Sequence, residues 1–128
     1  MNVPRVLISE DESDIRDAVT YKLEGAGISV TAVDTGTAAL SQALDDPPDL
    51  VLLDVMTPGL TGLDVARALR STPATARIPI IMLTAETGDG DVEAGYRAGV
   101  DAYLCKPFSP RDLLSRVCAM LHNTTNMA

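Results

Sequence analysis

The sequence predicts an α/β domain: a doubly wound parallel sheet of five strands, in the order 2-1-3-4-5, with helices on both faces. Five short apolar runs recur along the chain, and each is followed by apolar residues at helical spacing. The run at 50–53 does not alternate with polar residues, which is typical of a strand buried on both faces of a parallel sheet. Because crossovers between parallel strands are right-handed, successive helices are expected on both faces.

The first half of the chain is predicted to form two strand–helix pairs. A strand at 6–8 leads into a helix that begins with Ser13 as its N-cap. A second strand at 30–33 leads into a helix that ends at Pro47, because proline cannot continue a helix. The apolar residues that these helices are expected to turn toward the core are Ile15, Val19 and Leu23 in the first, and Ala39, Leu40, Ala43 and Leu44 in the second.

The second half is predicted to add three more strands, each followed by a helix. The strands are expected at 50–54, 78–84 and 101–105. A helix after Gly62 stops before Pro73, and a glycine-rich segment at 88–99 predicts a helix of low intrinsic stability. The last helix begins near Pro110, because proline is favoured in the first turn, and residues 123–128 are expected to be a frayed tail.

Composition and charge limit the classes of protein to which the chain can belong. Its length and hydrophobic content predict one globular domain, at 1–122, followed by the tail at 123–128. The net charge of −8 argues against a broad nucleic-acid-binding surface. No apolar run is long enough to span a membrane, and the N-terminus has no signal-peptide pattern. Cys105 and Cys118 match no metal or redox spacing, so buried, reduced thiols and a cytoplasmic location are expected.

Reactive side chains end four of the five predicted strands. Glu10 and Asp11 follow the first strand, Asp54 ends the third, Thr84 ends the fourth and Lys106 follows the fifth. The carboxyl ends of parallel strands meet at one edge of the sheet, which is where ligands bind in folds of this type. The alternative interpretation is that these residues are unrelated caps and surface charges.

Three carboxylates at one edge of a sheet require a counter-charge. Two unit charges 4 Å apart repel by roughly 4 kcal/mol at an effective dielectric constant near 20. A hard cation with oxygen ligands relieves this repulsion, so we expect Mg²⁺, with Mn²⁺ as an alternative. Together with the ammonium of Lys106 and the hydroxyl of Thr84, such a cation would supply what phosphoryl transfer to Asp54 requires, namely positioning and charge neutralisation.

At these positions the sequence resembles the response-regulator receiver domains of two-component signalling. The resemblance rests on Glu10-Asp11, the stretch at 54–62, Thr84-Ala85, and Tyr103-Leu104-Cys105-Lys106-Pro107-Phe108. These motifs occur in the family's order and spacing across residues 5 to about 121. The resemblance implies a flavodoxin-like fold. It also implies a regulatory phosphoacceptor, not an enzyme, that takes part in its own phosphotransfer and autodephosphorylation.

The resemblance further implies how the acidic residues act. Asp54 would be the nucleophile that takes a phosphoryl group from the phosphohistidine of a histidine kinase or a phosphotransfer protein. Asp11 and Asp54 would bind Mg²⁺ directly, while Glu10 would act mainly through water. Met56 would offer its backbone carbonyl to the metal. Mg²⁺ is therefore the expected cofactor, with ligands from 10, 11, 54 and 56.

Three more residues receive signalling roles from the resemblance. Lys106 would pair with the phosphoryl group, and the peptide bond between it and Pro107 is expected to be cis. Thr84 would hydrogen-bond to the phosphoryl group and report its presence. Tyr103 would be the aromatic switch that responds to Thr84; the alternative is an ordinary half-buried strand residue.

Residues around the site are expected to set the lifetime of the adduct and to bind the kinase. Met56 and Glu86 correspond to the family positions that flank the path of hydrolytic water, and we expect both to tune dephosphorylation. Ile15 lies one helical turn after the acids and is the best apolar candidate for a kinase docking contact. Ordinary core packing is the alternative role for Ile15.

The output of the domain is less defined by the sequence. A downstream protein or a fused output domain is expected as partner, with no direct contact to nucleic acid or membrane. Ala102 and Glu86 interrupt the charge ladder by which related receivers dimerise, although Asp112 and Arg116 remain, so a monomer or weak dimer is expected. The chain could also be the receiver part of a larger response regulator or of a hybrid kinase.

Two other functions remain as alternatives. An aspartate-based phosphatase of the haloacid-dehalogenase kind needs a second aspartate two positions after the nucleophile, where this chain has Met56. A phosphorylation-independent interaction module would normally lack one of the four reactive residues, and all four are present. A nucleotide-binding P-loop is absent from the sequence.

Overall fold

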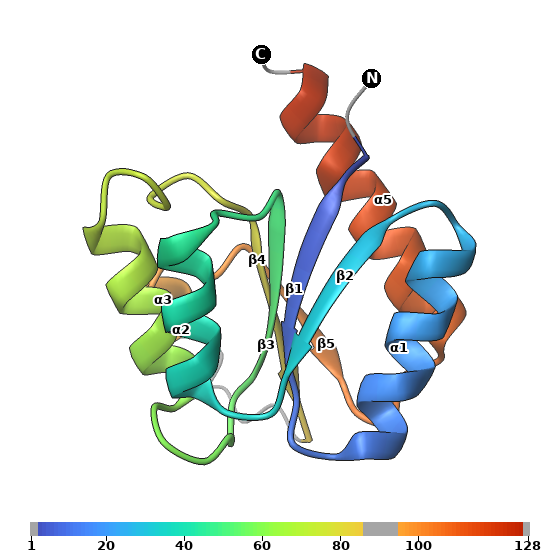
Figure 1. Ribbon diagram of the computed structural model, residues 1–128, viewed down its shortest axis with the longest axis horizontal. Helices are drawn as coiled ribbons and strands as arrows, with labels where there is room; N and C mark the ends of the chain where they lie inside the picture. The colour runs from blue at the N-terminus through green and yellow to red at the C-terminus, as the bar shows by residue number, and fades with distance from the viewer. Residues whose placement is uncertain (1–2, 86–94, 127–128) are drawn as a thin grey trace.

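The computed structural model describes residues 3–85 and 95–126, and within this part five strands form a single parallel sheet (Figure 1). The strand order is β2-β1-β3-β4-β5, which confirms the predicted topology. The strands are β1 (Arg5–Ser9), β2 (Ser29–Val33), β3 (Leu50–Asp54), β4 (Ile80–Thr84) and β5 (Ala102–Cys105). The helices are α1 (Ser13–Gly25), α2 (Gly36–Asp45), α3 (Gly62–Ser71) and α5 (Pro110–Asn126).

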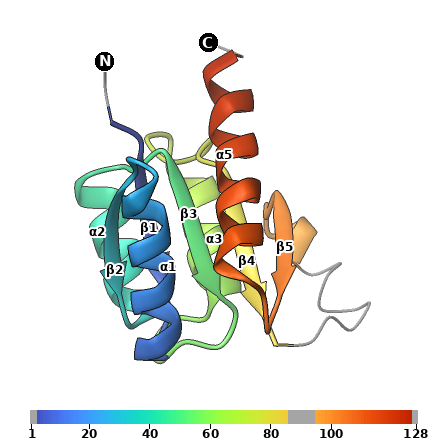
Figure 2. The same cartoon turned by 90° about the vertical axis from the view of Figure 1, so that its right-hand side faces the viewer.

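Helices cover both faces of the sheet. Helices α1 and α5 lie on one face and α2 and α3 on the other, as Figure 1 and Figure 2 show. Side chains alternate along each strand, so Leu52 of β3 joins the core beneath α1 and α5, while Leu53 joins the core beneath α2 and α3. Every residue of β3 is buried. The uninterrupted apolar run at 50–53 is therefore explained by a strand that faces a core on both sides.

The loop between β3 and α3 is held at both ends. The amide of Gly36 donates to the carbonyl of Pro58 over 3.1 Å, and the amide of Gly62 donates to the carbonyl of Val55 over 3.0 Å. A side chain at Gly62 would place its Cβ 2.6 Å from the backbone carbonyl oxygen of Asp54, so only glycine lets α3 begin this close to the sheet. Helix α3 then starts with a capping box between Thr61 and Asp64.

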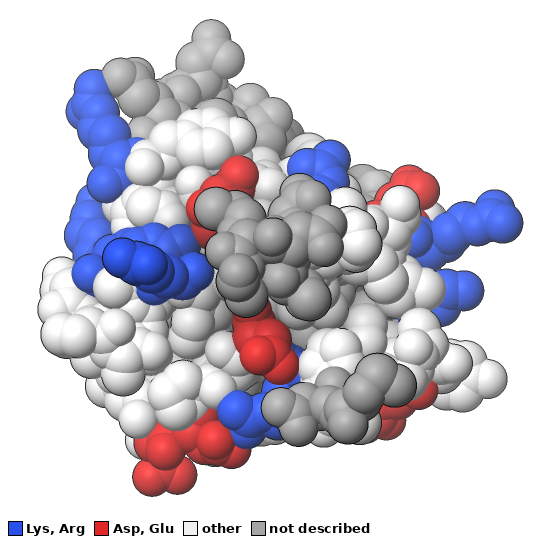
Figure 3. Space-filling view, turned by 90° about the horizontal axis from the view of Figure 1, so that it is seen from above, with Lys and Arg blue, Asp and Glu red and all other residues white. Residues whose placement is uncertain are grey.

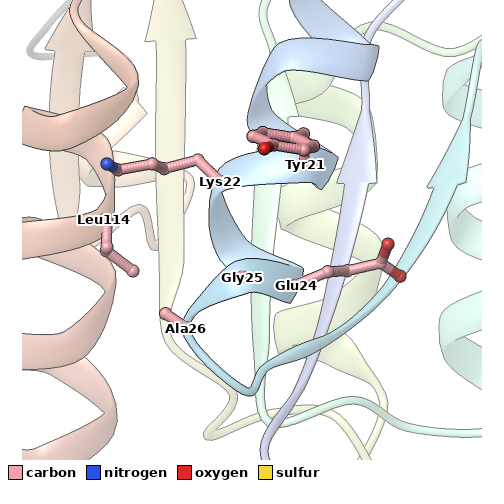
Figure 4. A pocket seen from close by; sticks show the side chains of 6 residues that line it. All are labelled: Tyr21, Lys22, Glu24, Gly25, Ala26 and Leu114. Atoms are coloured by element: carbon pink, nitrogen blue, oxygen red, sulfur yellow. The ribbon is translucent and has the colours of Figure 1, made fainter.

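The amino ends of the strands lie at the opposite edge, which is the upper end of the molecule in Figure 1. Figure 3 shows this end, where acidic and basic side chains are scattered in small groups among uncharged ones. A hollow of about 420 Å³ lies between the end of α1 and α5, lined by Tyr21, Lys22, Glu24, Gly25, Ala26 and Leu114 (Figure 4). No helix in the described ranges is both long enough and apolar enough to cross a membrane.

The start of α1 and the exposure of Leu44 differ from the sequence-based expectation. Helix α1 takes Glu12, not Ser13, as its N-cap residue, and this cap makes no side-chain hydrogen bond. Leu44 is 44% exposed, because α2 turns the smaller Ala39 and Ala43 toward the sheet. The expected burial of Cys105 and Cys118 is also wrong, because both cysteines are exposed.

Three further element ends also differ from the prediction. Strand β4 begins at Ile80 and β5 at Ala102, one or two residues later than expected. Helix α5 continues to Asn126, so 123–126 are helical and not a frayed tail. Of the weak helix expected at 88–99, the part before residue 95 lies outside the described residues.

Candidate functional site

The carboxyl ends of β1, β3, β4 and β5 bring the predicted reactive residues to one edge, at the lower end of the sheet in Figure 1. In the register of the sheet, Asp54 lies beside Leu83, and Thr84 lies beside Cys105. The ends of β3, β4 and β5 therefore lie side by side at this edge, and Lys106 directly follows the end of β5. Glu10, Asp54 and Thr84 are all buried.

The acidic cluster of Glu10, Asp11 and Asp54 is the central feature of this edge. One carboxylate oxygen from each residue lies within 4.8 Å of the other two. Glu10 is 0% exposed and Asp54 is 6% exposed, whereas Asp11 is open to solvent. Three oxygen donors converging from two strand ends, with one side left open, suit a hard divalent cation that keeps part of its water shell.

Lys106 connects the two buried carboxylates. Its Nζ lies 2.7 Å from Oε1 of Glu10 and 3.0 Å from Oδ2 of Asp54. The other carboxylate oxygens accept backbone amides: Oε2 of Glu10 from Glu12 over 3.1 Å, and Oδ1 of Asp54 from Met56 over 3.1 Å. Each buried acid is thus oriented by one amide and by the same ammonium group. The peptide bond between Lys106 and Pro107 is cis, as expected.

The charges in the cluster shift one another's pKa values. Burial raises the pKa of Glu10, and the ion pair with Lys106 only partly offsets this effect. Burial alone would lower the pKa of Lys106, but its hydrogen bonds to Glu10 and Asp54 outweigh burial, so its pKa is raised. Lys106 therefore remains positively charged at neutral pH. The cluster holds three carboxylates, and Lys106 pairs with only two of them, so the donor set can accommodate a further positive charge.

Arg16 is a residue of this edge that sequence reasoning missed. Its Nη1 donates to the backbone carbonyl of Glu10 over 2.9 Å. Arg16 is the fourth residue of α1 and lies in its first turn, and this bond helps to fix the turn that carries Glu10 and Asp11. The only sequence signal was a basic residue on the helix after the acids, which is common on solvated helices.

The predicted switch residues share one face of the sheet. Tyr103 lies beside Met82 in register and Thr84 lies beside Cys105, so both side chains project on the side covered by α2 and α3. The ring of Tyr103 is half-buried and makes an edge contact with Tyr96, with ring centroids 5.2 Å apart. This placement fits a residue that responds to movement at the end of β4.

The remaining predicted site residues have different surroundings. Ile15 is half-buried and lines an apolar groove of about 230 Å³ together with Pro107 and Phe108, so it contacts both core and surface. Met56 is 75% exposed beside the acidic cluster. Glu86 lies outside the described residues.

The fold and the edge geometry define an α/β domain with a candidate cation and phosphoryl site, and comparison with known proteins identifies its family. The family model of the response regulator receiver domain matches residues 6–118. The chain is similar to the DNA-binding response regulator MtrA of Mycolicibacterium paratuberculosis, with 43% identity over 91% of this chain and 51% of that protein. It is also similar to the phosphate regulon transcriptional regulatory protein PhoB of Pseudomonas aeruginosa, with 41% identity over 93% and 52%.

A solved structure agrees with these relatives. The chemotaxis response regulator CheY4 of Vibrio cholerae superimposes with a TM-score of 0.88 at 32% identity, covering 93% of this chain and 99% of that chain. The chain therefore belongs to the response regulator receiver domain family. It spans about half the length of the MtrA and PhoB relatives.

Proposed function

We propose that the chain accepts a phosphoryl group on Asp54 from the phosphohistidine of a histidine kinase or a phosphotransfer protein, and that this changes a surface read by a partner. The observation that carries the proposal is the convergence of the Glu10, Asp11 and Asp54 carboxylates, two of which, those of Glu10 and Asp54, pair with the ammonium of Lys106. Such an arrangement concentrates negative charge where a cation and a phosphoryl group are to be bound. Family membership supports the same conclusion.

In the proposed reaction, a carboxylate oxygen of Asp54 attacks phosphorus as the bond from phosphorus to the histidine nitrogen breaks, and the imidazole leaves with its electron pair. A divalent cation, proposed to be Mg²⁺ with Mn²⁺ as a substitute, would be held by Glu10, Asp11, Asp54 and the carbonyl of Met56, and would neutralise phosphoryl oxygens. Lys106, whose Nζ lies 3.0 Å from Oδ2 of Asp54, would neutralise further charge. The amide of Met56, 3.1 Å from Oδ1, holds the Asp54 carboxylate in place during attack.

Two alternatives are separated from this proposal by one experiment. The protein is incubated with Mg²⁺ and acetyl phosphate, and the products are analysed by mass spectrometry, with Asp54→Asn as the control. The proposal requires one phosphoryl group per chain, located on Asp54 and persisting for seconds or longer. Many turnovers of phosphate release would indicate a phosphatase, and the absence of any adduct would indicate a phosphorylation-independent interaction module.

The kinase is proposed to dock on the apolar groove beside the site, where Ile15 faces Pro107 and Phe108. An acidic residue in this groove should hinder an apolar contact, so Ile15→Glu should slow transfer from a histidine kinase and leave acetyl phosphate labelling unchanged. Tyr21→Glu is a matched control, because it adds the same charge to α1 at a position that is 83% exposed. Equal loss with both donors would show that Ile15 serves the core instead.

The lifetime of the adduct is proposed to depend on Met56 and Glu86. The apolar side chain of Met56 is exposed two residues after Asp54 and would hinder the approach of water. Glu86 would change autodephosphorylation without being required for phosphorylation. A Glu86→Ala variant that loses phosphate at the wild-type rate would remove Glu86 from this role.

The downstream partner is proposed to be an output domain of the same protein or a separate protein. The chain spans about half the length of the MtrA and PhoB relatives, which supports a receiver that works within a longer regulator. MtrA is a DNA-binding response regulator by name. We propose that this domain itself acts in the cytoplasm as a monomer or weak dimer, and that it binds neither nucleic acid nor membrane.

A further inference from the structure

The ring of Tyr103 lies directly against the backbone of Gly95. A Cβ atom built on Gly95 would overlap the hydroxyl oxygen and the Cζ atom of Tyr103, and it would come within 3.3 Å of Cε1. The neighbouring Tyr96 packs against the same ring at an interplanar angle of 70°. The orientation of Tyr103 therefore depends on position 95 having no side chain.

The backbone at Gly95 is anchored and has little freedom to retreat from the ring. Its carbonyl accepts the amide of Val100 over 3.0 Å, and the carbonyl of Tyr96 accepts the amide of Gly99 over 3.1 Å. The carbonyl of Gly99 in turn accepts Nε of Arg70 over 2.9 Å. This chain of bonds ties the segment at 95–100 to α3. A side chain added at position 95 would thus displace the end of the flexible Tyr103 side chain before it displaced the backbone.

We propose that Gly95 is a positioning residue for Tyr103. The Tyr103 ring rests against the backbone of Gly95, a contact surface that we call the seat, and only a residue without a side chain leaves room for the ring there. Gly95 thereby sets the ratio between the observed, seated orientation of the ring and orientations in which the ring has left this surface. The proposal deepens the proposed function, because Tyr103 is the proposed switch residue. Any change in that ratio alters the surface formed by Tyr96 and Tyr103. Position 95 would then set how much of this surface is presented before any phosphoryl group arrives.

Gly95→Ala tests the proposal in the full chain without metal or phosphodonor. Aromatic-labelled tyrosine spectra and nuclear Overhauser contacts report the position of the Tyr103 ring. We expect the contacts between Tyr103 and Tyr96 to be lost and the Tyr103 ring to become accessible to a soluble paramagnetic probe. Gly25→Ala is the matched control, because a Cβ there meets nothing within 4 Å, and it should leave the ring in place.

A double-mutant cycle keeps the test valid if Gly95→Ala lowers stability. In the Tyr103→Ala background no ring occupies the seat, so the added methyl group should lower the melting temperature less than it does in the wild type. An equal drop in both backgrounds would overturn the proposal, as would a Gly95→Ala protein with a seated Tyr103 ring. Neither readout involves Asp54. A failure of phosphorylation would therefore count against the proposed function, and not against this seat.

Discussion

The two edges of the sheet differ in how their charged side chains are paired. At the amino ends of the strands, acids and bases are matched: Arg70 pairs with Asp101 over 2.8 Å, and an Arg5 nitrogen lies 2.6 Å from Asp46. At the carboxyl ends, Glu10, Asp11 and Asp54 lie close together, and Lys106 pairs with two of them, Glu10 and Asp54. At the first edge the two acids, Asp46 and Asp101, are paired within the chain. The second carries more negative charge than the ammonium of Lys106 offsets, so it suits a bound cation.

Arg70 shows what a neutralised edge contributes. Besides the pair with Asp101, it donates to the carbonyls of Ala76 and Ile78 over 3.1 and 2.7 Å. The same Asp101 oxygen accepts the amide of Ile80 over 2.8 Å. This network joins α3 to the starts of β4 and β5 and serves stability. Because this network stabilises the fold, the carboxyl edge can tolerate the mutual repulsion of its three carboxylates. We interpret that repulsion as a property of the functional site.

The largest expected effect that separates the edges is stabilisation by the metal. A cation that binds only the folded state at one hundred times its dissociation constant raises the free energy of unfolding by about 2.7 kcal/mol. Urea unfolding with Mg²⁺ and with EDTA should show this difference in the wild type, and Asp11→Ala should abolish it. Asp17→Ala removes an exposed acid from α1 outside the cluster and should preserve it. No difference between Mg²⁺ and EDTA in the wild type would contradict the metal site.

The next effect concerns the amino edge. Arg70→Met should lower the free energy of unfolding by about 2 kcal/mol, because several carbonyls and Asp101 lose a charged donor. The response to Mg²⁺ should remain as in the wild type. Arg67→Met is the control, since its contact with Asp64 is long at 3.8 Å and exposed, and such changes usually stay within about 0.5 kcal/mol. An equal loss in both variants would refute the importance of this network.

A smaller effect is expected from the pH dependence of Glu10. Burial raises its pKa above the usual 4.5, so ionisation is less favourable in the folded than in the unfolded chain. The stability associated with protonated Glu10 is complete below pH 4.5 and is lost as pH rises through the raised pKa. In EDTA, the unfolding free energy of the wild type should therefore fall relative to Glu10→Gln as pH increases from 4.5. If the two unfolding free energies change with pH in parallel, ionisation of Glu10 is not less favourable in the folded chain, and this prediction is wrong.

The smallest change in stability is expected for Thr84→Ala, which tests transmission from the site. The variant should still accept beryllofluoride on Asp54, because Thr84 is not among the acidic residues that bind the cation. It should lose the hydroxyl that responds to the phosphoryl mimic, so the protection of residues 95–108 should no longer change. Amide hydrogen exchange with and without beryllofluoride measures this. Equal protection changes in the variant and the wild type would break the proposed link from Thr84 to Tyr103.

Much of the fold and the acidic cluster could be predicted because they depend on local patterns. The run at 50–53 identified a strand buried on both faces, and residues at the strand ends then had to meet. Element ends were harder to predict because tertiary contacts decide them. Ile78 is apolar but donates its amide to Thr75 in a turn, and Asp101 is held by Arg70 before β5 begins.

The contacts of Arg16 and Gly95 were beyond sequence reasoning for a similar reason. Arg16 donates to the backbone carbonyl of Glu10. Every residue type has such a carbonyl, so the residue types give no signal for this contact. The importance of Gly95 appears only when the ring of Tyr103, from another strand, is placed against it. Within a sequence, a glycine in a helical segment indicates only low helix propensity.

The comparison between the edges is tested most directly by thermal melting in EDTA of two matched variants, Asp54→Asn and Asp101→Asn. Each removes one carboxylate charge and keeps the shape of the side chain. We predict that Asp54→Asn melts at the same temperature as the wild type or higher, because it relieves repulsion and leaves Lys106 paired with Glu10. Asp101→Asn should melt lower, because Arg70 loses its counter-charge. A lower melting temperature for Asp54→Asn, comparable to that of Asp101→Asn, would contradict this account.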